Sequence, residues 1–143
     1  MLATACKGDA SAEARMFLDR YERLDMDDPL EERRRLVDNL RTMPLAHSDV
    51  TQARDVCVDA HDAILEAEDL RVEAVALLER CGPVCAGQPA GPEVDGTAEQ
   101  LSARLELDQN MGRAERALER SRGLFSRCHR ETAALNTRYR RRR

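Results

Sequence analysis

Five cysteines and three histidines are the residues of this chain whose types and spacing could do chemistry. Because five is an odd number, a fully paired set leaves one cysteine over. With Cys6 set aside, the other four allow three pairings, of which we favour Cys57 with Cys128 and Cys81 with Cys85. This pairing requires an oxidising compartment. The alternative is that Cys57 and Cys128 are reduced core residues, because a free cysteine packs as a small hydrophobe.

A metal site is a second interpretation of the same residues. Cys57 and His61 are four residues apart, and Cys128 is followed by His129. Two thiolates and two imidazoles suit zinc or copper. However, both histidines fall beside the apolar seam of their helices, and His129 is rotated by about 100° from Cys128. The alternative is that these are solvated surface histidines, and we expect neither a metal nor another cofactor.

The sequence lacks the motifs of common enzyme classes. It contains no glycine-rich phosphate loop, no G-x-S-x-G and no H-E-x-x-H. Asp59, Asp62, Glu66 and Asp69 could suggest a di-metal carboxylate bundle, but that site needs Glu-x-x-His pairs, and none occurs. The other carboxylates alternate with arginine at helical spacing, which is typical of a solvated face. We therefore expect a protein that is not an enzyme.

Long amphipathic helices must position these residues. Charged residues make up 35% of the chain and aromatic residues only 3%, a composition typical of helices rather than sheets. Capping residues and prolines predict one helical domain over residues 12–139, with Ser11, Asp28, Ser48 and Thr97 as starts and Thr97 with Gln100 as a capping box. The predicted helices cover about 12–25, 29–43, 49–81 and 98–139, with a proline- and glycine-rich loop at 82–96.

The two longest helices carry small and apolar residues at alternating steps of three and four, the seam of a coiled coil. Setting Cys57 opposite Cys128 in an antiparallel pair fixes the facing layers. These are Val50 with Leu135, Ala60 with Phe125, Ile64 with Ser121, Ala67 with Leu118, Ala74 with Met111, and Leu78 with Leu107. A slip of one heptad keeps the seam equally well, so only a bond between the cysteines selects the register. We predict an all-α fold, a three- or four-helix bundle with a long antiparallel helical hairpin.

The sequence Ala3-Thr4-Ala5-Cys6, preceded by Leu2, resembles the lipobox of bacterial lipoproteins. The resemblance covers five residues and departs from the usual form, because Leu2 is four residues before the cysteine rather than three. The charged and apolar parts of a signal peptide do not precede it, and we interpret residues 1–5 as the last residues of a truncated one. The resemblance implies that Cys6 carries a lipid, that residues 7–11 form a flexible tether, and that Lys7 favours sorting to the outer membrane. The alternative is a disordered N-terminus with an incidental cysteine.

The basic tail, residues 140–143, follows Arg138 and Tyr139 in the sequence RYRRRR. Arg138, Arg140, Arg141, Arg142 and Arg143 could contact an anionic envelope surface. The alternative is a frayed helix end, where cations suit the helix dipole. The segment 1–98 has a net charge of −10 and the segment 99–143 one of +6, which favours pairing of the two within one chain. Nucleic acid is not expected as a partner, because a nucleic-acid binder would usually add aromatic stacking or a helix face that reads bases, and the isoelectric point of the sequence is only about 5.5.

These features together favour a non-enzymatic helical lipoprotein or periplasmic protein of the bacterial envelope that acts as a structural or protein-interaction module. Its expected partner is an unidentified envelope protein, a homo-oligomer is compatible with the sequence, and its membrane attachment is through a lipid on Cys6 only. Two alternatives remain: a periplasmic metal-binding or stress-response helical protein, and a cytoplasmic coiled-coil adaptor.

Overall fold

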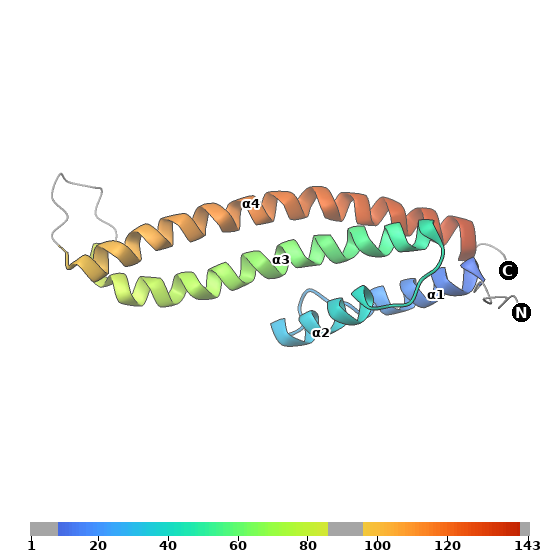
Figure 1. Cartoon of the computed structure of the whole chain (residues 1–143), viewed down its shortest axis with the longest axis horizontal. Coiled ribbons are helices and arrows are strands. Elements are labelled where there is room, and N and C mark those ends of the chain that lie inside the picture. The colour runs from blue at the N-terminus through green and yellow to red at the C-terminus, as the bar shows by residue number, and fades with distance from the viewer. Residues whose placement is uncertain (1–8, 86–95, 141–143) are drawn as a thin grey trace, which may run out of the picture. The chain divides into compact units, whose positions relative to one another are not determined.

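The computed structural model describes residues 9–85 and 96–140, and these residues form four α-helices and no strand (Figure 1). The helices are α1 (Ala10–Tyr21), α2 (Leu30–Arg41), α3 (Ser48–Cys81) and α4 (Ala98–Leu135), with a 3-10 turn at Gly82–Val84 and a π-helical turn at Asn136–Arg140. The long helices α3 and α4 pack antiparallel, which confirms the predicted all-α hairpin. The chain divides into unit 1, residues 1–62 and 121–143, and unit 2, residues 63–120.

The helix starts follow local hydrogen bonding. Asp9, and not the predicted Ser11, caps α1, because the Asp9 carboxylate accepts the Ser11 backbone N–H at 3.1 Å. Pro29 occupies the cap position of α2 in place of Asp28, and no side chain caps that helix. The predicted capping box of α4 is confirmed. The Thr97 N–H donates to Gln100 at 2.9 Å, and the Gln100 N–H donates to the Thr97 hydroxyl at 3.2 Å.

Unit 1 has a core to which all four helices contribute. α1 buries Phe17 and Leu18 completely, and α2 buries Val37 and Leu40. Further members of this core come from the start of α3, the end of α4 and the segment before α3: Met43, Val50, Ala53, Val56, Cys57, Val58, Ala60, Ser121, Cys128, Thr132 and Leu135. The predicted pairing of Val50 with Leu135 is consistent with this burial, since both are nearly inaccessible.

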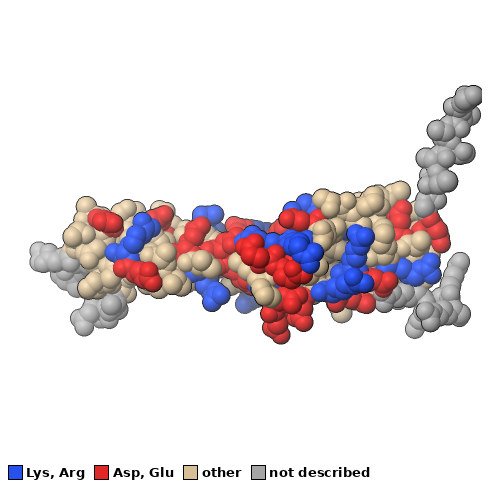
Figure 2. Space-filling model, turned by 90° about the horizontal axis from the view of Figure 1, so that it is seen from below, with Lys and Arg blue, Asp and Glu red and all other residues tan. Residues whose placement is uncertain are grey.

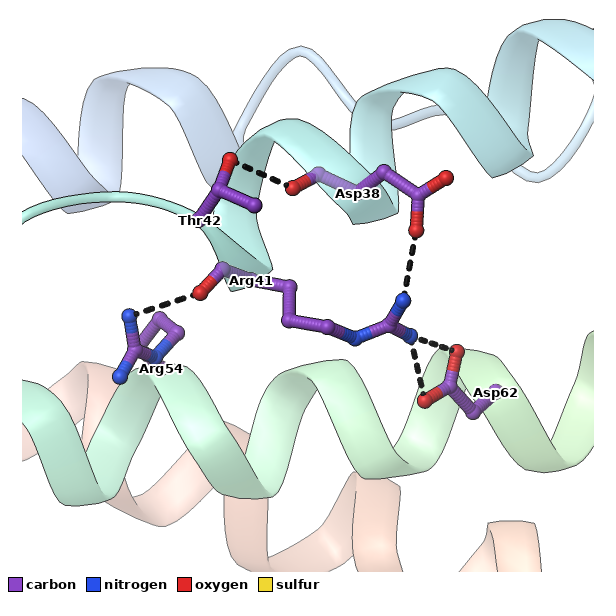
Figure 3. A network of polar contacts seen from close by, with 5 residues as sticks. All are labelled: Asp38, Arg41, Thr42, Arg54 and Asp62. Carbon is purple, nitrogen blue, oxygen red and sulfur yellow. Dashed lines mark hydrogen bonds and ion pairs between the residues drawn. The ribbon is translucent and has the colours of Figure 1, made fainter.

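Polar contacts fasten α2 and the following segment to α3 (Figure 3). The Arg41 guanidinium donates to Asp38 on its own helix at 2.6 Å and to both carboxylate oxygens of Asp62 on α3. Arg54 of α3 donates to the backbone carbonyls of Arg41 and Met43, at 3.2 and 3.0 Å. These bonds satisfy carbonyl groups at the end of α2, which have no partner within the helix.

Glu13 of α1 fixes the chain just before α3. Its carboxylate accepts the backbone N–H groups of Ala46 and His47, at 2.9 and 3.0 Å. Burial alone would raise the pKa of Glu13, but the two amide donors and the His47 side chain outweigh it and hold the pKa below its ordinary value. The charged carboxylate of Glu13 therefore accepts the hydrogen bonds that these two backbone N–H groups would otherwise donate to water.

The predicted seam is wrong by one residue at alternate positions of unit 2, and correct at the positions between them. Leu78, Met111 and Leu118 were expected inside, yet they are 47%, 50% and 43% exposed. Ala67 and Ala74 are buried as predicted. The other buried seam positions are Ala63, Leu70, Leu77 and Cys81 on α3, and Ala103, Asn110 and Ala117 on α4. The physical reason lies in the predicted seam itself, which would have placed the charged Arg71 inside the hairpin. In the observed seam Arg71 is exposed.

Candidate interaction surface

Both predicted cysteine pairs lie at disulfide distance. The Cα atoms of Cys57 and Cys128 are 4.8 Å apart, and those of Cys81 and Cys85 are 5.6 Å apart, within the range that disulfides span. The first pair joins α3 to α4 within unit 1 and is almost completely buried. The second joins the end of α3 to the residue after the 3-10 turn. The structure thus supports the predicted pairing over the interpretation of Cys57 and Cys128 as separate reduced residues.

An aromatic cluster surrounds the buried pair. The Tyr21 hydroxyl donates to the sulfur of Cys128 at 3.1 Å. The Tyr21 ring is stacked on Phe17, with ring centroids 5.8 Å apart, and meets the edge of His61 at the same separation. Burial raises the pKa of the Tyr21 phenol. The cluster therefore packs α1 onto the point where α3 and α4 are joined.

His61 is a core residue, which corrects the expectation of a solvated surface histidine. It is only 5% exposed, and its ring also contacts Phe125 edge-on at 4.9 Å between centroids. Burial and, next, the charge of Arg33 lower its pKa from 6.5 to about 4, so the imidazole is neutral at physiological pH. His129 is exposed, as predicted.

The metal interpretation loses its sulfur ligands to the cysteine pair. With Cys57 and Cys128 at bonding distance from each other, neither offers a free thiolate. Across residues 9–85 and 96–140, no group of three or more His, Cys, Asp or Glu side chains is arranged to hold a metal ion.

The predicted lipid and anion sites lie largely outside the described residues. This is the case for Cys6, for the side chain of Arg140 and for Arg141, Arg142 and Arg143. Arg138 is described, and it donates to Asp49 of α3 at 2.7 Å. The same carboxylate accepts the Tyr139 hydroxyl at 2.6 Å, and this bond, followed by the one from Arg138, lowers the pKa of Asp49. The end of the helical chain is thus anchored within unit 1, and contact of the arginines with an anionic surface stays a prediction.

A basic hollow of about 380 Å³ was not predicted. It is lined by Arg20, Arg23, Arg35, Leu36 and Asn39, from α1, the segment that follows it and α2. Arg35 pairs with Glu32 on its own helix, and the guanidinium groups of Arg20 and Arg23 add positive charge that could attract an anion. The arginines of helix faces look alike in the sequence, and only the fold brings these three together.

The two edges of the unit 2 hairpin differ in chemistry. One, the ion-paired edge, carries the residues that immediately precede the buried seam positions. There Glu66 accepts from Arg120 at 2.5 Å and Arg80 pairs with Glu106 at 3.5 Å. Glu73 on the same edge accepts from the buried amide of Asn110 at 3.1 Å. Charged side chains thus bridge α3 and α4 along this edge and close it.

The opposite edge is apolar and open. It carries the residues that follow every second buried seam position, namely Ala63, Leu70 and Leu77 on α3 and Ala103, Asn110 and Ala117 on α4, a rotation of about 100° from the seam. Because the helices are antiparallel, these residues of α3 and α4 lie on the same side of the hairpin. We define the apolar edge as Ile64, Arg71 and Leu78 of α3 with Arg104, Met111 and Leu118 of α4. Three of its four apolar side chains are among the exposed large hydrophobic residues of the described chain.

Charge does not close the apolar edge. Arg104 donates to the backbone carbonyl of Val84 at 3.2 Å. Arg71 makes no ion pair with a described residue. On the face seen in Figure 2, acidic and basic side chains lie next to one another, with uncharged surface between them over unit 2. The apolar edge is therefore a surface of the described part of unit 2 on which large apolar side chains are exposed between arginines.

Comparison of the chain with models of known protein families, with curated proteins and with solved structures finds no significant match. Among the described helices, none combines the length and the apolar character that crossing a bilayer requires.

Proposed function

We propose that this protein is a non-enzymatic structural or protein-interaction module of the bacterial cell envelope, attached to the membrane by a lipid on Cys6. The observation that carries the interaction role is the apolar edge of unit 2. Leu78, Met111 and Leu118 are each about half exposed there, at a spacing that a further helix could cover. Exposed large apolar side chains that gather on one face are typical of surfaces that bind a partner.

The cysteine pairs support the envelope as the compartment. Four of the five cysteines pair within the described chain, and such pairs persist in an oxidising compartment such as the periplasm. Cys6 is then the one cysteine without a partner in this scheme, which agrees with the lipobox resemblance of residues 3–6. One acyl chain gives only reversible membrane attachment, whereas a cysteine that carries three acyl chains is anchored stably.

Mass spectrometry of the chain isolated from its native membrane fraction tests this proposal. We expect the intact mass to exceed that of the polypeptide by covalently bound acyl chains, and to increase by about 4 Da on reduction of two disulfides. Labelling of growing cells with an alkyne fatty acid should mark the protein, and Cys6→Ser should abolish the label. Cys85→Ser is the matched control and should keep it. Five free thiols and an unlabelled chain would refute the envelope assignment.

A further inference from the structure

We propose that the apolar edge of unit 2 binds the same edge of a second copy of this chain, so that two hairpins form an antiparallel four-helix bundle. This inference deepens the proposed function, on whose interaction role it rests, by naming the partner. A two-stranded pair needs apolar residues only at the seam, whereas helices of a larger bundle carry them also at one flanking position. In unit 2 that flanking position is the apolar edge.

The composition of the seam points the same way. Five of the buried seam residues in unit 2 are alanines, namely Ala63, Ala67, Ala74, Ala103 and Ala117. A buried alanine contributes about one methyl group, or roughly 0.8 kcal/mol, against about 1.5–3 kcal/mol for a buried leucine. The larger side chains Leu78, Met111 and Leu118 stand outside this seam. Much of the apolar surface of unit 2 is therefore not buried within the hairpin and is available for a contact outside it.

The height of each residue along the hairpin decides how two copies would meet. Leu77 and Cys81 pack with Ala103 and Leu107, so Arg71 on α3 lies level with the stretch of α4 near Arg113. A twofold axis along the hairpin places α3 of one copy against α4 of the other, again antiparallel. Arg71 of one copy then faces Met111 of the other and lies within about two residues of rise, roughly 3 Å, of its Glu115.

Charge selects this arrangement over the other twofold one. An axis perpendicular to the helices would place α3 against α3 of the second copy. Ile64 and Leu78 lie seven residues on either side of Arg71, so matching them across such an axis would bring the two Arg71 side chains together. Like charges at that point are unfavourable. With the axis along the hairpin, Arg71 meets an acidic residue instead, and the pair forms twice because of the symmetry.

Sedimentation equilibrium of the full chain is the first test. We expect a mass twice that of one chain at a protein concentration of about 100 µM. At this concentration a dimer with a micromolar dissociation constant is almost fully formed. Leu118→Glu should raise the dissociation constant on the order of 100-fold, because each dimer buries the new charge twice. Leu105→Glu is the matched control, since Leu105 is 61% exposed and lies on neither edge, and it should leave the mass unchanged. A monomer at all concentrations would overturn the proposal.

A charge exchange tests the orientation without changing the apolar residues. Arg71→Glu and Glu115→Arg should each raise the dissociation constant about tenfold, and the two changes together should restore it to within about threefold. Both residues are exposed, so the fold should tolerate the exchange, which far-UV circular dichroism checks. Failure of the double variant to restore the dimer would overturn the arrangement with α3 against α4.

A photo-crosslinking residue at position 118 in cells separates this inference from the proposed function. A cross-linked product of two copies supports the second copy as partner, provided that the same residue at position 105 gives none. A cross-linked product with a different protein would overturn the inference that the partner is a second copy, but it would support the proposed interaction function. If neither position gives a product, both the dimer and the proposed interaction function are refuted.

Discussion

Lowering the pH should destabilise unit 1 through His61. This histidine is 5% exposed and held between the rings of Tyr21 and Phe125. Burial and then Arg33 depress its pKa from 6.5 to about 4. The unfolded chain therefore binds a proton at a pH where the folded chain does not. The stability that the neutral imidazole provides is fully present above pH 6.5 and is lost as the pH falls toward 4.

The magnitude follows from the two pKa values. The pKa of His61 differs by about 2.5 units between the unfolded and the folded chain. Well below pH 4, where both states are protonated, this difference corresponds to a loss of roughly 3 kcal/mol in the free energy of unfolding. Between pH 8 and pH 5 the same values give a loss of about 2 kcal/mol. Glu13 and Asp49 have lowered pKa values, so their stabilising charges are lost only at more acidic pH. Between pH 8 and pH 5, the change in the free energy of unfolding therefore reports mainly on His61.

Urea unfolding followed by far-UV circular dichroism measures this loss. The free energy of unfolding of the wild type should fall by about 2 kcal/mol from pH 8 to pH 5. His61→Leu keeps an apolar group of similar size and should abolish most of the fall. His129→Gln is the control, because His129 is exposed, and it should behave as the wild type does. An equal fall in His61→Leu, or a flat profile in the wild type, would refute the reasoning.

Two further predictions concern covalent and charged ties. Replacing Cys57 and Cys128 by alanine should lower the free energy of unfolding by about 4 kcal/mol, because the bond closes a long loop in the unfolded chain, whereas replacing Cys81 and Cys85 should cost only about 2 kcal/mol. Urea titration of both variants should give that order, and the reverse order would contradict it. Glu13→Gln should cost about 2 kcal/mol, since the carboxylate accepts two backbone amides. Hydrogen exchange at Ala46 and His47 should accelerate in this variant, and unchanged protection of both amides would argue against the role of Glu13.

The fold could be predicted because its signals are local. Apolar periodicity, prolines and the Thr97–Gln100 capping box are each read within a few residues. The cysteine pairing was also predictable, since Cys57 and Cys128 both fall in the apolar seams of the two long helices and can face each other in an antiparallel pair. Helix starts were less secure, because Asp9 and Ser11 are both good caps and only the backbone conformation separates them.

The seam of unit 2 and the environment of His61 could not be predicted in the same way. Apolar residues follow two overlapping repeats in unit 2, one through Leu77 and one through Leu78, and the pattern alone does not rank them. Arg71 was the available signal, because a charged residue in a narrow seam is costly. The burial of His61 depends on α1 lying across α3, a tertiary contact that no spacing within α3 encodes.

The bond between Cys57 and Cys128 makes the intervening chain a closed ring. Any single peptide bond within that ring, including those between α3 and α4, could be cut by a protease without releasing a fragment. The ring closure lies inside the core of unit 1, where Cys57 and Cys128 are at most 1% exposed. Reductants therefore reach it only after that core opens. After one such cut, the two pieces of the chain would stay joined through the disulfide. Unit 2 and its apolar edge would therefore remain covalently attached to unit 1.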